Sequence, residues 1–330
     1  MKKGENILQG RDVAVGYRQG KAIRWVVKNL SFSLQSAKLT CLLGPNGVGK
    51  STLIKAIMGQ NLPVKGEISY KGKPIGQLSP RDMARNVSVV LTDRISPGNL
   101  TVRQLVALGR IPFTSWLGSM SPEDEQAVQK ALDATHIGYI ENRKVSEISD
   151  GQLQKTMIAR ALAQDGKLII LDEPTAHLDL VNRLEIMQLL RDIAHTQQKA
   201  ILVVTHDLDI AVETADEFWL MPCGGPVVIG RPEDLILSGA INQLLPDGKL
   251  QFSPTTGKVQ AIMAEETIPV DGPEEVAQWL RMALRKQNML PSNALRLSVT
   301  KDPVSFLIYR KETKEQFYTI EETLNALQLE

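Results

Sequence analysis

Cysteine and aromatic residues are scarce in this 330-residue chain, and charge of neither sign dominates. The only cysteines, Cys41 and Cys223, stand far apart in sequence. Because Cys41 falls in an apolar run, a buried thiol is favoured over a disulfide, which fits a reducing cytoplasm. Lys and Arg total 38 against 37 Asp and Glu, so no basic field attracts nucleic acid. We expect no nucleic-acid partner.

Long hydrophobic runs are also absent. No apolar stretch approaches the ~20 residues that span a bilayer, and Met1–Arg11 carries charge without a following signal-like apolar core. We therefore expect no membrane span and a cytoplasmic location. The length is large for one domain and comfortable for two, and the 43% hydrophobic content can supply a real core.

One glycine-rich stretch fits the phosphate-loop pattern G-x-x-x-x-G-K-[ST]. It consists of Gly44, Pro45, Asn46, Gly47, Val48, Gly49, Lys50, Ser51 and Thr52. An apolar run, Leu39–Leu43, leads into it, and Leu53–Met58 follow at helical spacing, which is the strand–loop–helix context that the pattern requires. The alternative is a glycine-rich turn that happens to carry a lysine, and these flanks disfavour it.

The chemistry of this stretch suits a nucleotide. Glycines let backbone N–H groups turn inward around phosphate oxygens, and the helix that begins near Lys50 points its positive dipole end at them. Lys50 is expected to reach the β- and γ-phosphates, and the Ser51 hydroxyl to ligate Mg²⁺. The sequence thus predicts a nucleotide site at this loop.

Farther along, an apolar strand ends in two acids. Lys167–Leu171 lead directly into Asp172 and Glu173. Beside a phosphate loop, such a pair suits Mg²⁺-assisted hydrolysis, in which one carboxylate joins the metal shell and the next orients the attacking water. The alternative, an acid pair opening the next helix, is disfavoured because Pro174 follows at once.

The order of these motifs resembles that of the ATP-binding-cassette (ABC) ATPases. That family has a signature close to L-S-G-G-Q one helix before an apolar strand ending in Asp-Glu, and here Ile148–Gln152 precede Leu168–Glu173. It then has a loop ending in Leu-Asp and a strand ending in His, matched by Leu178-Asp179 and Ile201–His206. The resemblance covers roughly residues 5–262.

The resemblance implies an α/β P-loop NTPase fold with an antiparallel β subdomain and a helical subdomain at about residues 100–148. It also implies that two copies sandwich two ATP molecules with Mg²⁺. Within one copy, Glu173, His206 and Lys50 would be catalytic, and Ser51, Asp172 and Thr92 would serve the metal. The partner's ATP would be contacted by Ser149, Gly151, Gln152 and Asp179.

Two of these assignments have structural alternatives. Tyr17 looks like the adenine-stacking aromatic of the family, although by itself it is as readily a core or hairpin tyrosine. Ser149 and Gln152 also have the spacing of a helix capping box, so a purely structural role for Ser149 stays open.

The sequence departs from the family pattern at two positions. Thr92 stands where the family has a Gln that touches Mg²⁺ and water, and Asp150 replaces the first glycine of the signature. A shorter hydroxyl and an added negative charge near the partner's γ-phosphate both favour slow hydrolysis. A nucleotide-dependent binding module with little turnover is therefore a competing hypothesis.

A segment between the motifs suggests a branch of the family. The phrase Leu108-Gly109-Arg110-x-Pro112, followed by Ser121–Asp124, resembles ATPases that power uptake of iron-siderophore, haem or cobalamin. This implies a homodimer attached to a membrane permease on the inner face of the cell membrane, with a substrate-binding protein in the complex. The rival is a soluble ABC protein of translation or DNA repair, which usually has paired cassettes or a coiled-coil insert.

Local patterns complete the expectations. Residues 5–40 read as short antiparallel strands, and Val87–Leu91 as a core strand ending at Thr92. Residues 263–330 read as a separate α+β extension of β-α-β-β-α order, carrying 8 Lys and Arg against 11 Asp and Glu, a net charge of −3. Because this segment has no nucleotide motif, we expect it to regulate or dimerise the cassette of residues 1–262.

Overall fold

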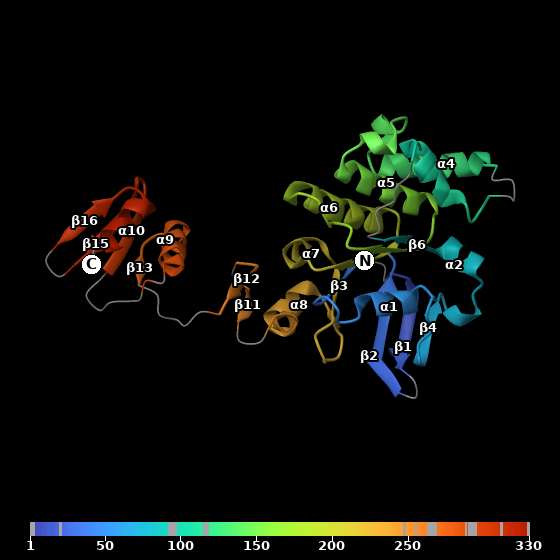
Figure 1. The fold of residues 1–330 in the computed structure, drawn as a ribbon, viewed down its shortest axis with the longest axis horizontal. Coiled ribbons are helices and arrows are strands. Elements are labelled where there is room, and N and C mark those ends of the chain that lie inside the picture. Colours follow the sequence, from blue (N-terminus) through green and yellow to red (C-terminus); the bar gives the residue numbers. More distant parts are fainter. Residues whose placement is uncertain are drawn as a thin grey trace. The chain divides into compact units, whose positions relative to one another are not determined.

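The computed structural model describes residues 4–19, 22–91, 98–114, 119–246, 249–254, 256–262, 269–287, 289, 296–310 and 313–328. The chain divides into two compact units, Met1–Gln260 and Ala261–Glu330, which we call unit 1 and unit 2. Each unit has a hydrophobic core of its own. Figure 1 labels the helices and strands of both units.

The centre of unit 1 is a six-stranded sheet with the strand order β10-β9-β3-β8-β7-β6. From β9 to β6 neighbouring strands run parallel, and β10 is antiparallel to β9. The strands are β3 (Lys38–Leu43), β6 (Val87–Val90), β7 (Leu168–Asp172), β8 (Ala200–Thr205), β9 (Glu217–Leu220) and β10 (Val228–Gly230). Strands β3, β7 and β8 are buried almost throughout, as parallel strands covered on both faces are. The predicted strand at 87–91 is present and ends one residue early.

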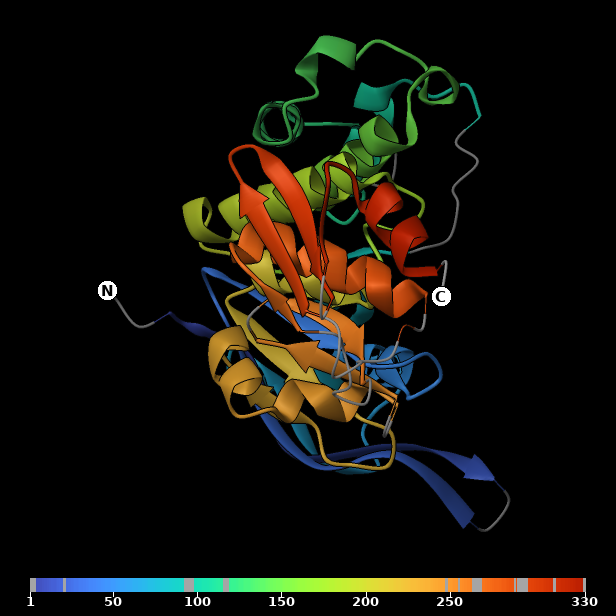
Figure 2. The ribbon, with the colours of Figure 1, turned by 90° about the vertical axis from the view of Figure 1, so that its left-hand side faces the viewer.

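A second, antiparallel sheet has the order β2-β1-β4-β5. Its strands are β1 (Asn6–Gln19), β2 (Ala22–Gln35), β4 (Lys65–Tyr70) and β5 (Lys73–Pro74). The prediction of several short strands over residues 5–40 was wrong, because two 14-residue strands form a long ribbon there (Figure 2). Register shifts between Gly10 and Gly16 interrupt the alternation of β1, so the apolar pattern looked like separate strands.

Helices cover the six-stranded sheet and include the predicted helical segment after Thr101. The helices are α1 (Lys50–Ile57), α2 (Pro80–Asn86), α3 (Val102–Ala107), α4 (Pro122–Ala134), α5 (Asp150–Ala163), α6 (Leu180–Thr196), α7 (Leu208–Thr214) and α8 (Pro232–Leu237). The short 3-10 helices are η1 (Ile75–Gln77), η2 (Leu108–Arg110), η3 (Gly138–Ile140), η4 (Val145–Glu147) and η5 (Ala240–Leu244). Strands β11 (Leu250–Ser253) and β12 (Lys258–Ala261) pair in a two-stranded sheet. None of the helices in the described part of the chain is long and apolar enough to cross a membrane.

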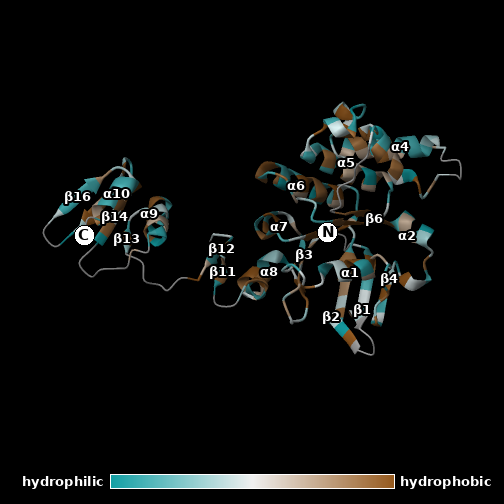
Figure 3. Ribbon diagram, viewed as in Figure 1, coloured by the Kyte–Doolittle hydropathy of each residue, from teal (hydrophilic) through white to brown (hydrophobic). Residues whose placement is uncertain are grey.

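Two apolar layers position the phosphate loop. One packs the six-stranded sheet against α3, α5 and α6. Figure 3 shows both hydrophobic and hydrophilic residues on α5 and α6. The other lies between the two sheets, where the rings of Phe32 and Trp219 are 4.8 Å apart, and it includes Leu53 and Ile57 of α1. Because α1 is anchored in this second layer, its first turn is fixed at the end of β3. Cys41 is buried in β3, as predicted, and is not in a disulfide.

Unit 2 is a four-stranded sheet with two helices. Its elements are β13 (Val270–Asp271), α9 (Glu274–Lys286), β14 (Arg296–Lys301), β15 (Val304–Tyr309), β16 (Lys314–Phe317) and α10 (Ile320–Gln328). Strand order is β13-β14-β15-β16, with β13 parallel to β14 and the other pairs antiparallel. The predicted β-α-β-β-α order missed β16, because a four-residue strand with one apolar residue gives no alternation to detect.

Candidate nucleotide-binding site

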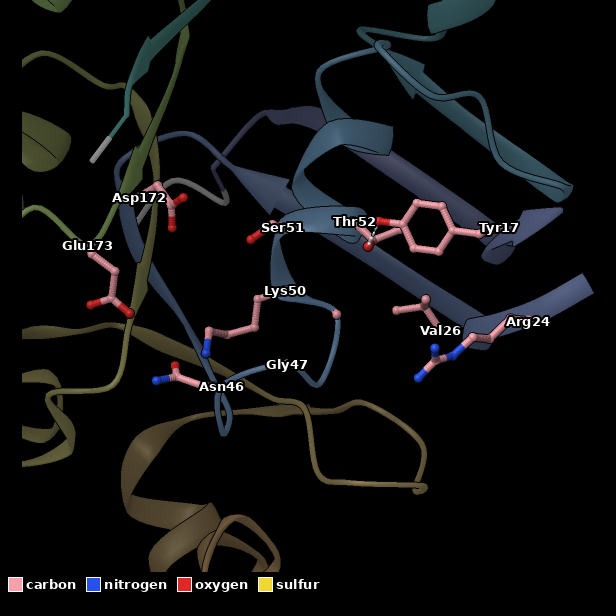
Figure 4. A pocket seen from close by; sticks show the side chains of 11 residues that line it. Tyr17, Arg24, Val26, Asn46, Gly47, Lys50, Ser51, Thr52, Asp172 and Glu173 are labelled. Carbon is pink, nitrogen blue, oxygen red and sulfur yellow. Dashed lines mark hydrogen bonds between the residues drawn. The ribbon is translucent and has the colours of Figure 1, made fainter. Parts of the chain in front are cut away.

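A cavity of about 530 Å³ lies beside the phosphate loop of unit 1. It opens at the carboxyl ends of β3 and β7, where open α/β sheets bind ligands. The lining residues are Tyr17, Arg24, Val26, Asn46, Gly47, Gly49, Lys50, Ser51, Thr52, Asp172 and Glu173 (Figure 4). The structure therefore brings the predicted loop and the predicted acid pair into one cavity.

The loop is shaped by its glycines. Gly47 and Gly49 have φ values of 79° and 114°, which side-chain-bearing residues rarely adopt. A Cβ atom on Gly49 would stand 1.9 Å from Cγ1 of Val26, so no larger residue fits there. Gly49 is the N-cap of α1, which begins at Lys50, and the first turn of this helix lines the cavity with its positive dipole end.

Lys50 is held inside the loop. Its Nζ donates hydrogen bonds to the carbonyl oxygens of Gly44, at 2.6 Å, and Pro45, at 3.2 Å. Burial lowers the pKa of Lys50, and the nearby charges of Glu173 and Asp172 oppose that shift. The Lys50 ammonium is thus a desolvated cation between the loop and the acid pair, placed to meet an anionic ligand.

The opposite end of the cavity is made by the β1–β2 ribbon. Tyr17 on β1 pairs in register with Arg24 on β2, and Val26 follows on the same strand. The Tyr17 side chain is 46% exposed, and its hydroxyl is hydrogen-bonded to Oγ1 of Thr52. Sequence reasoning missed Arg24 and Val26. The signal for Arg24 was the hairpin register, which places it opposite Tyr17, and Val26 lies two residues farther along the same strand.

Backbone and side-chain contacts hold the acid pair, Asp172 and Glu173, at its end of the cavity. Asp172 is the last residue of β7, and Glu173 has a φ of 49°, an uncommon value for a residue with a side chain. The N–H of Glu173 donates to the carbonyl oxygen of Val204, at 2.9 Å. Oε2 of Glu173 lies 2.8 Å from Nδ1 of His206. The structure therefore joins the predicted acid to the predicted histidine.

The residue after this histidine ties the site to α6. Asp207 accepts a hydrogen bond from Oγ1 of Thr175, at 2.7 Å, and lies 3.4 Å from Nη1 of Arg183. The Nε of Arg183 also donates to the carbonyl oxygen of Leu178, at 2.7 Å. These contacts fix the loop that follows Glu173 against the loop that contains His206.

The oxygen donors of the cavity suit magnesium. Mg²⁺ is usually bound through one or two carboxylates, a hydroxyl, water and substrate phosphates. Ser51 and Asp172 line the same cavity and supply one hydroxyl and one carboxylate, and Figure 4 shows both on the side of the loop that faces Glu173. Within the described ranges no group of three His, Cys, Asp or Glu could hold a metal ion alone.

Comparison with known proteins identifies the family. The family model described as ABC transporter matches residues 27–176. An uncharacterised ABC transporter ATP-binding protein of Methanocaldococcus jannaschii is 37% identical over 251 residues, which cover 76% of this chain and 85% of that protein. The chain belongs to the ABC transporter ATP-binding proteins.

Other relatives of this ABC protein have more specific names. The achromobactin transport ATP-binding protein of Dickeya dadantii is 37% identical, over 69% of this chain and 84% of that protein. The iron(3+)-hydroxamate import ATP-binding protein of Bacillus subtilis is 33% identical, over 77% of this chain and 93% of that protein. A dimeric ATP-binding cassette solved with ADP and phosphate has a TM-score of 0.57 and 25% identity, covering 68% of this chain and 99% of that one. As an ABC ATP-binding protein, the chain binds and hydrolyses ATP to power transport.

The residues predicted to act in the ABC dimer lie apart from the chain's own cavity. None of Ser149, Gly151, Gln152 and Asp179 is among its lining residues. Ser149 is the N-cap of α5, and its capping box with Gln152 is complete, as the sequence spacing predicted. Nε2 of Gln152 also donates to the hydroxyl of Tyr139, at 3.1 Å. The cap and the tyrosine thus hold the signature loop in place.

Helix α6 also packs against the ABC signature, Ile148–Gln152. Asp179 is the N-cap of α6, and its carboxylate accepts hydrogen bonds from the backbone and side-chain N–H groups of Asn182, at 2.9 and 2.8 Å. A Cβ atom on Gly151 would stand 2.8 Å from Oδ1 of Asn182. Gly151 therefore allows α6 to approach α5 closely. Sequence reasoning missed Asn182, since only the packing of the two helices reveals it.

The two departures from the ABC pattern differ in what the structure shows. Asp150 is the first residue of α5 and is exposed, where an acid interacts favourably with the helix dipole. Thr92, predicted to serve the metal, lies outside the described residues.

Proposed function

We propose that this chain is the ATP-hydrolysing subunit of an importer for iron-siderophore, haem or cobalamin. The observation that carries the proposal is one cavity in which Lys50 and Ser51 face Asp172 and Glu173. The substrate class is supported by relatives named for iron(3+)-hydroxamate import and achromobactin transport.

Within the cavity, each side chain has a proposed task. Lys50 neutralises the terminal phosphates, and Tyr17 stacks on the adenine at the β1–β2 end. The Glu173 carboxylate takes a proton from the attacking water, because this acid lies beside the phosphate loop and is held by a hydrogen bond with His206. Mg²⁺, held by Ser51 and Asp172 with Thr92 in place of the family glutamine, would neutralise charge on the phosphate oxygens.

The partners follow from the same proposal. Two copies face each other so that Ser149, Gly151, Gln152 and Asp179 of one contact the ATP of the other, which agrees with their position outside the chain's own cavity. The dimer sits on the inner face of the cell membrane and drives a separate permease that receives its substrate from a binding protein.

Uptake by the intact transporter tests this proposal. Cells carrying the chain with its permease are given labelled iron-siderophore, haem and cobalamin in turn. We expect one of these to accumulate with the wild-type chain and not with Glu173→Gln. The matched control is Glu67→Gln, which makes the same change at an exposed residue of β4 and should leave uptake intact. Transport of an unrelated solute alone, such as an amino acid, would contradict the substrate class.

Fractionation of native cells separates this proposal from its rival. An importer subunit is recovered with membranes and with its permease. A soluble ABC protein of translation or DNA repair is recovered with ribosomes or DNA, and recovery solely in that fraction would overturn the importer assignment.

A further inference from the structure

Helix α9 of unit 2 has one face that its own unit leaves uncovered. Ala277, Leu280 and Leu284 are buried against the sheet. On the exposed side, Trp279 is 57% and Met282 46% exposed. A large aromatic side chain and a methionine that share one exposed helix face are typical of an interaction surface, because solvation of such side chains is unfavourable.

The exposed face is symmetric in spacing and carries opposite charges at its two ends. Glu275 precedes Trp279 by four residues, and Lys286 follows Met282 by four, so all four side chains fall on one stripe of the helix. All four are exposed. We call these residues the α9 stripe. Read in either direction, it has a charged end, an apolar pair and an end of opposite charge.

We propose that the α9 stripe binds the α9 stripe of a second copy of this chain in an antiparallel, two-fold contact. A two-fold axis between Trp279 and Met282 places each of them opposite the other in the second copy. The same axis then places each Glu275 opposite a Lys286. One register therefore satisfies the apolar pair and both charge pairs, whereas a parallel arrangement would place like charges together.

Within the described part of unit 2, Glu275 already has a salt-bridge partner. Oε2 of Glu275 is paired with Nζ of Lys301, and both side chains are largely exposed. An exposed pair of this kind contributes little to stability, so Glu275 can accept a second cation at small cost. Lys286 lies at the other end of α9, in the last turn.

Such a contact is too small to hold two free chains together. A single helix pair buries less than the roughly 1,200 Å² of a stable interface. ABC cassettes work as dimers, however, so two copies of unit 2 belong to each assembly. Tethering two binding surfaces within one assembly raises the effective concentration of one for the other, up to the millimolar range for short flexible linkers. The contact therefore adds to the closure of the cassette dimer and is not a substitute for it.

Cysteine cross-linking of the full chain with ATP tests the contact. Cys223 is exposed and is first changed to Ser. Met282→Cys places one thiol on each side of the proposed axis, and a short bismaleimide should join the two copies efficiently. Tyr318→Cys, an exposed position of the same unit outside α9, is the matched control and should react at least about tenfold less. Equal cross-linking at the two positions, or none at Met282→Cys, would overturn the proposal.

A charge exchange tests the antiparallel register. Lys286→Glu brings two glutamates together at both ends of the contact, so cross-linking should fall about tenfold. Arg285→Glu makes the same charge change on an exposed residue off the stripe and should have little effect. The double variant Glu275→Lys with Lys286→Glu restores opposite charges and should recover cross-linking. Failure of the double variant to recover, with its circular dichroism unchanged, would rule out the two-fold pairing.

Discussion

Glu173 and His206 meet at the ends of the adjacent strands β7 and β8, with Oε2 of the acid 2.8 Å from Nδ1 of the ring. A carboxylate accepts hydrogen bonds, so Nδ1 is the donor, and this contact holds one Glu173 oxygen against the ring. The acid side chain is 17% exposed and the ring 62%. The histidine therefore fixes the direction in which the carboxylate faces the phosphate loop.

The first prediction concerns Glu173, the acid that we propose acts on the attacking water. Glu173→Gln should retain ATP binding and lower kcat at least about a hundredfold, because an amide cannot accept the proton of the attacking water. Lys50→Ala should instead weaken ATP binding, since it removes the cation that meets the phosphates. Nucleotide titration and steady-state turnover measure the two effects. Wild-type turnover in Glu173→Gln would show that another group is the base.

The second prediction concerns a buried ion pair between η2 and α4. Nε of Arg110 lies 2.7 Å from Oδ1 of Asp124, and both side chains are about nine-tenths buried. Hydrogen bonds from Ser121 and Arg110 lower the pKa of Asp124. Asp124→Asn should cost about 2 kcal/mol of unfolding free energy at pH 7, because it leaves Arg110 buried beside a neutral amide.

The sign of the pH dependence follows from that lowered pKa. The stabilisation by Asp124 is fully present above the ordinary carboxyl pKa, near 4, and is lost as the pH falls through the lower folded-state pKa. The difference between wild type and Asp124→Asn should therefore shrink below about pH 4 in denaturant titrations. Asp133→Asn, an exposed change on the same helix, is the control. A difference that stays constant with pH would contradict the pairing.

The third prediction concerns the close approach of α5 and α6. Gly151→Ala should destabilise unit 1 by about 1–2 kcal/mol, because the new methyl group meets Oδ1 of Asn182. Asn182→Ala removes that oxygen, so the double variant should regain most of the lost stability, as thermal unfolding would show. If Asn182→Ala gave no relief, the clash would lie elsewhere.

Some residues of the site could be predicted from the sequence and others could not. The phosphate loop, the acid pair and the capping box of Ser149 could be predicted because each is a local pattern with fixed spacing. Arg24 and Asn182 could not, because a hairpin register and a helix–helix packing bring them to their places. The positive φ of Glu173 has no signal in composition either, since glutamate rarely adopts it.

The fold shows the same division. The buried runs of β3, β7 and β8 and the caps of α4 and α5 follow from residue type alone. The length of β1 could not be predicted, because bulges shift the alternation of its apolar residues. Strand β16 could not be predicted either, because it is short and mostly polar.

The fourth prediction concerns unit 2. Removing residues 263–330 should leave a folded ATPase with altered turnover or dimerisation. The residues that line the nucleotide cavity and the two apolar layers around it all belong to unit 1. Nucleotide binding and size-exclusion chromatography of the truncated chain measure this. Loss of all nucleotide binding would show that unit 2 completes the cassette.

The last prediction concerns the two departures from the family pattern. One well-placed polar contact to a developing charge can be worth about 3 kcal/mol, or roughly a hundredfold in rate. Thr92 has a shorter reach than glutamine, and exposed Asp150 adds a negative charge at the start of α5 beside Gly151. We therefore expect slow turnover by the isolated subunit, with stimulation by the permease.

Restoring the family residues tests whether Thr92 and Asp150 slow ATP hydrolysis. Thr92→Gln and Asp150→Gly should each raise basal ATPase activity, because one returns a long amide and the other removes charge near the partner's γ-phosphate. Asp150→Gly also removes a favourable charge from the helix N-terminus, so a small loss of stability should accompany its gain in rate. Asp150→Asn separates the two, since it removes the charge without adding a glycine. No gain in rate from any of the three changes would mean that neighbouring groups already compensate, and that slow turnover has another origin.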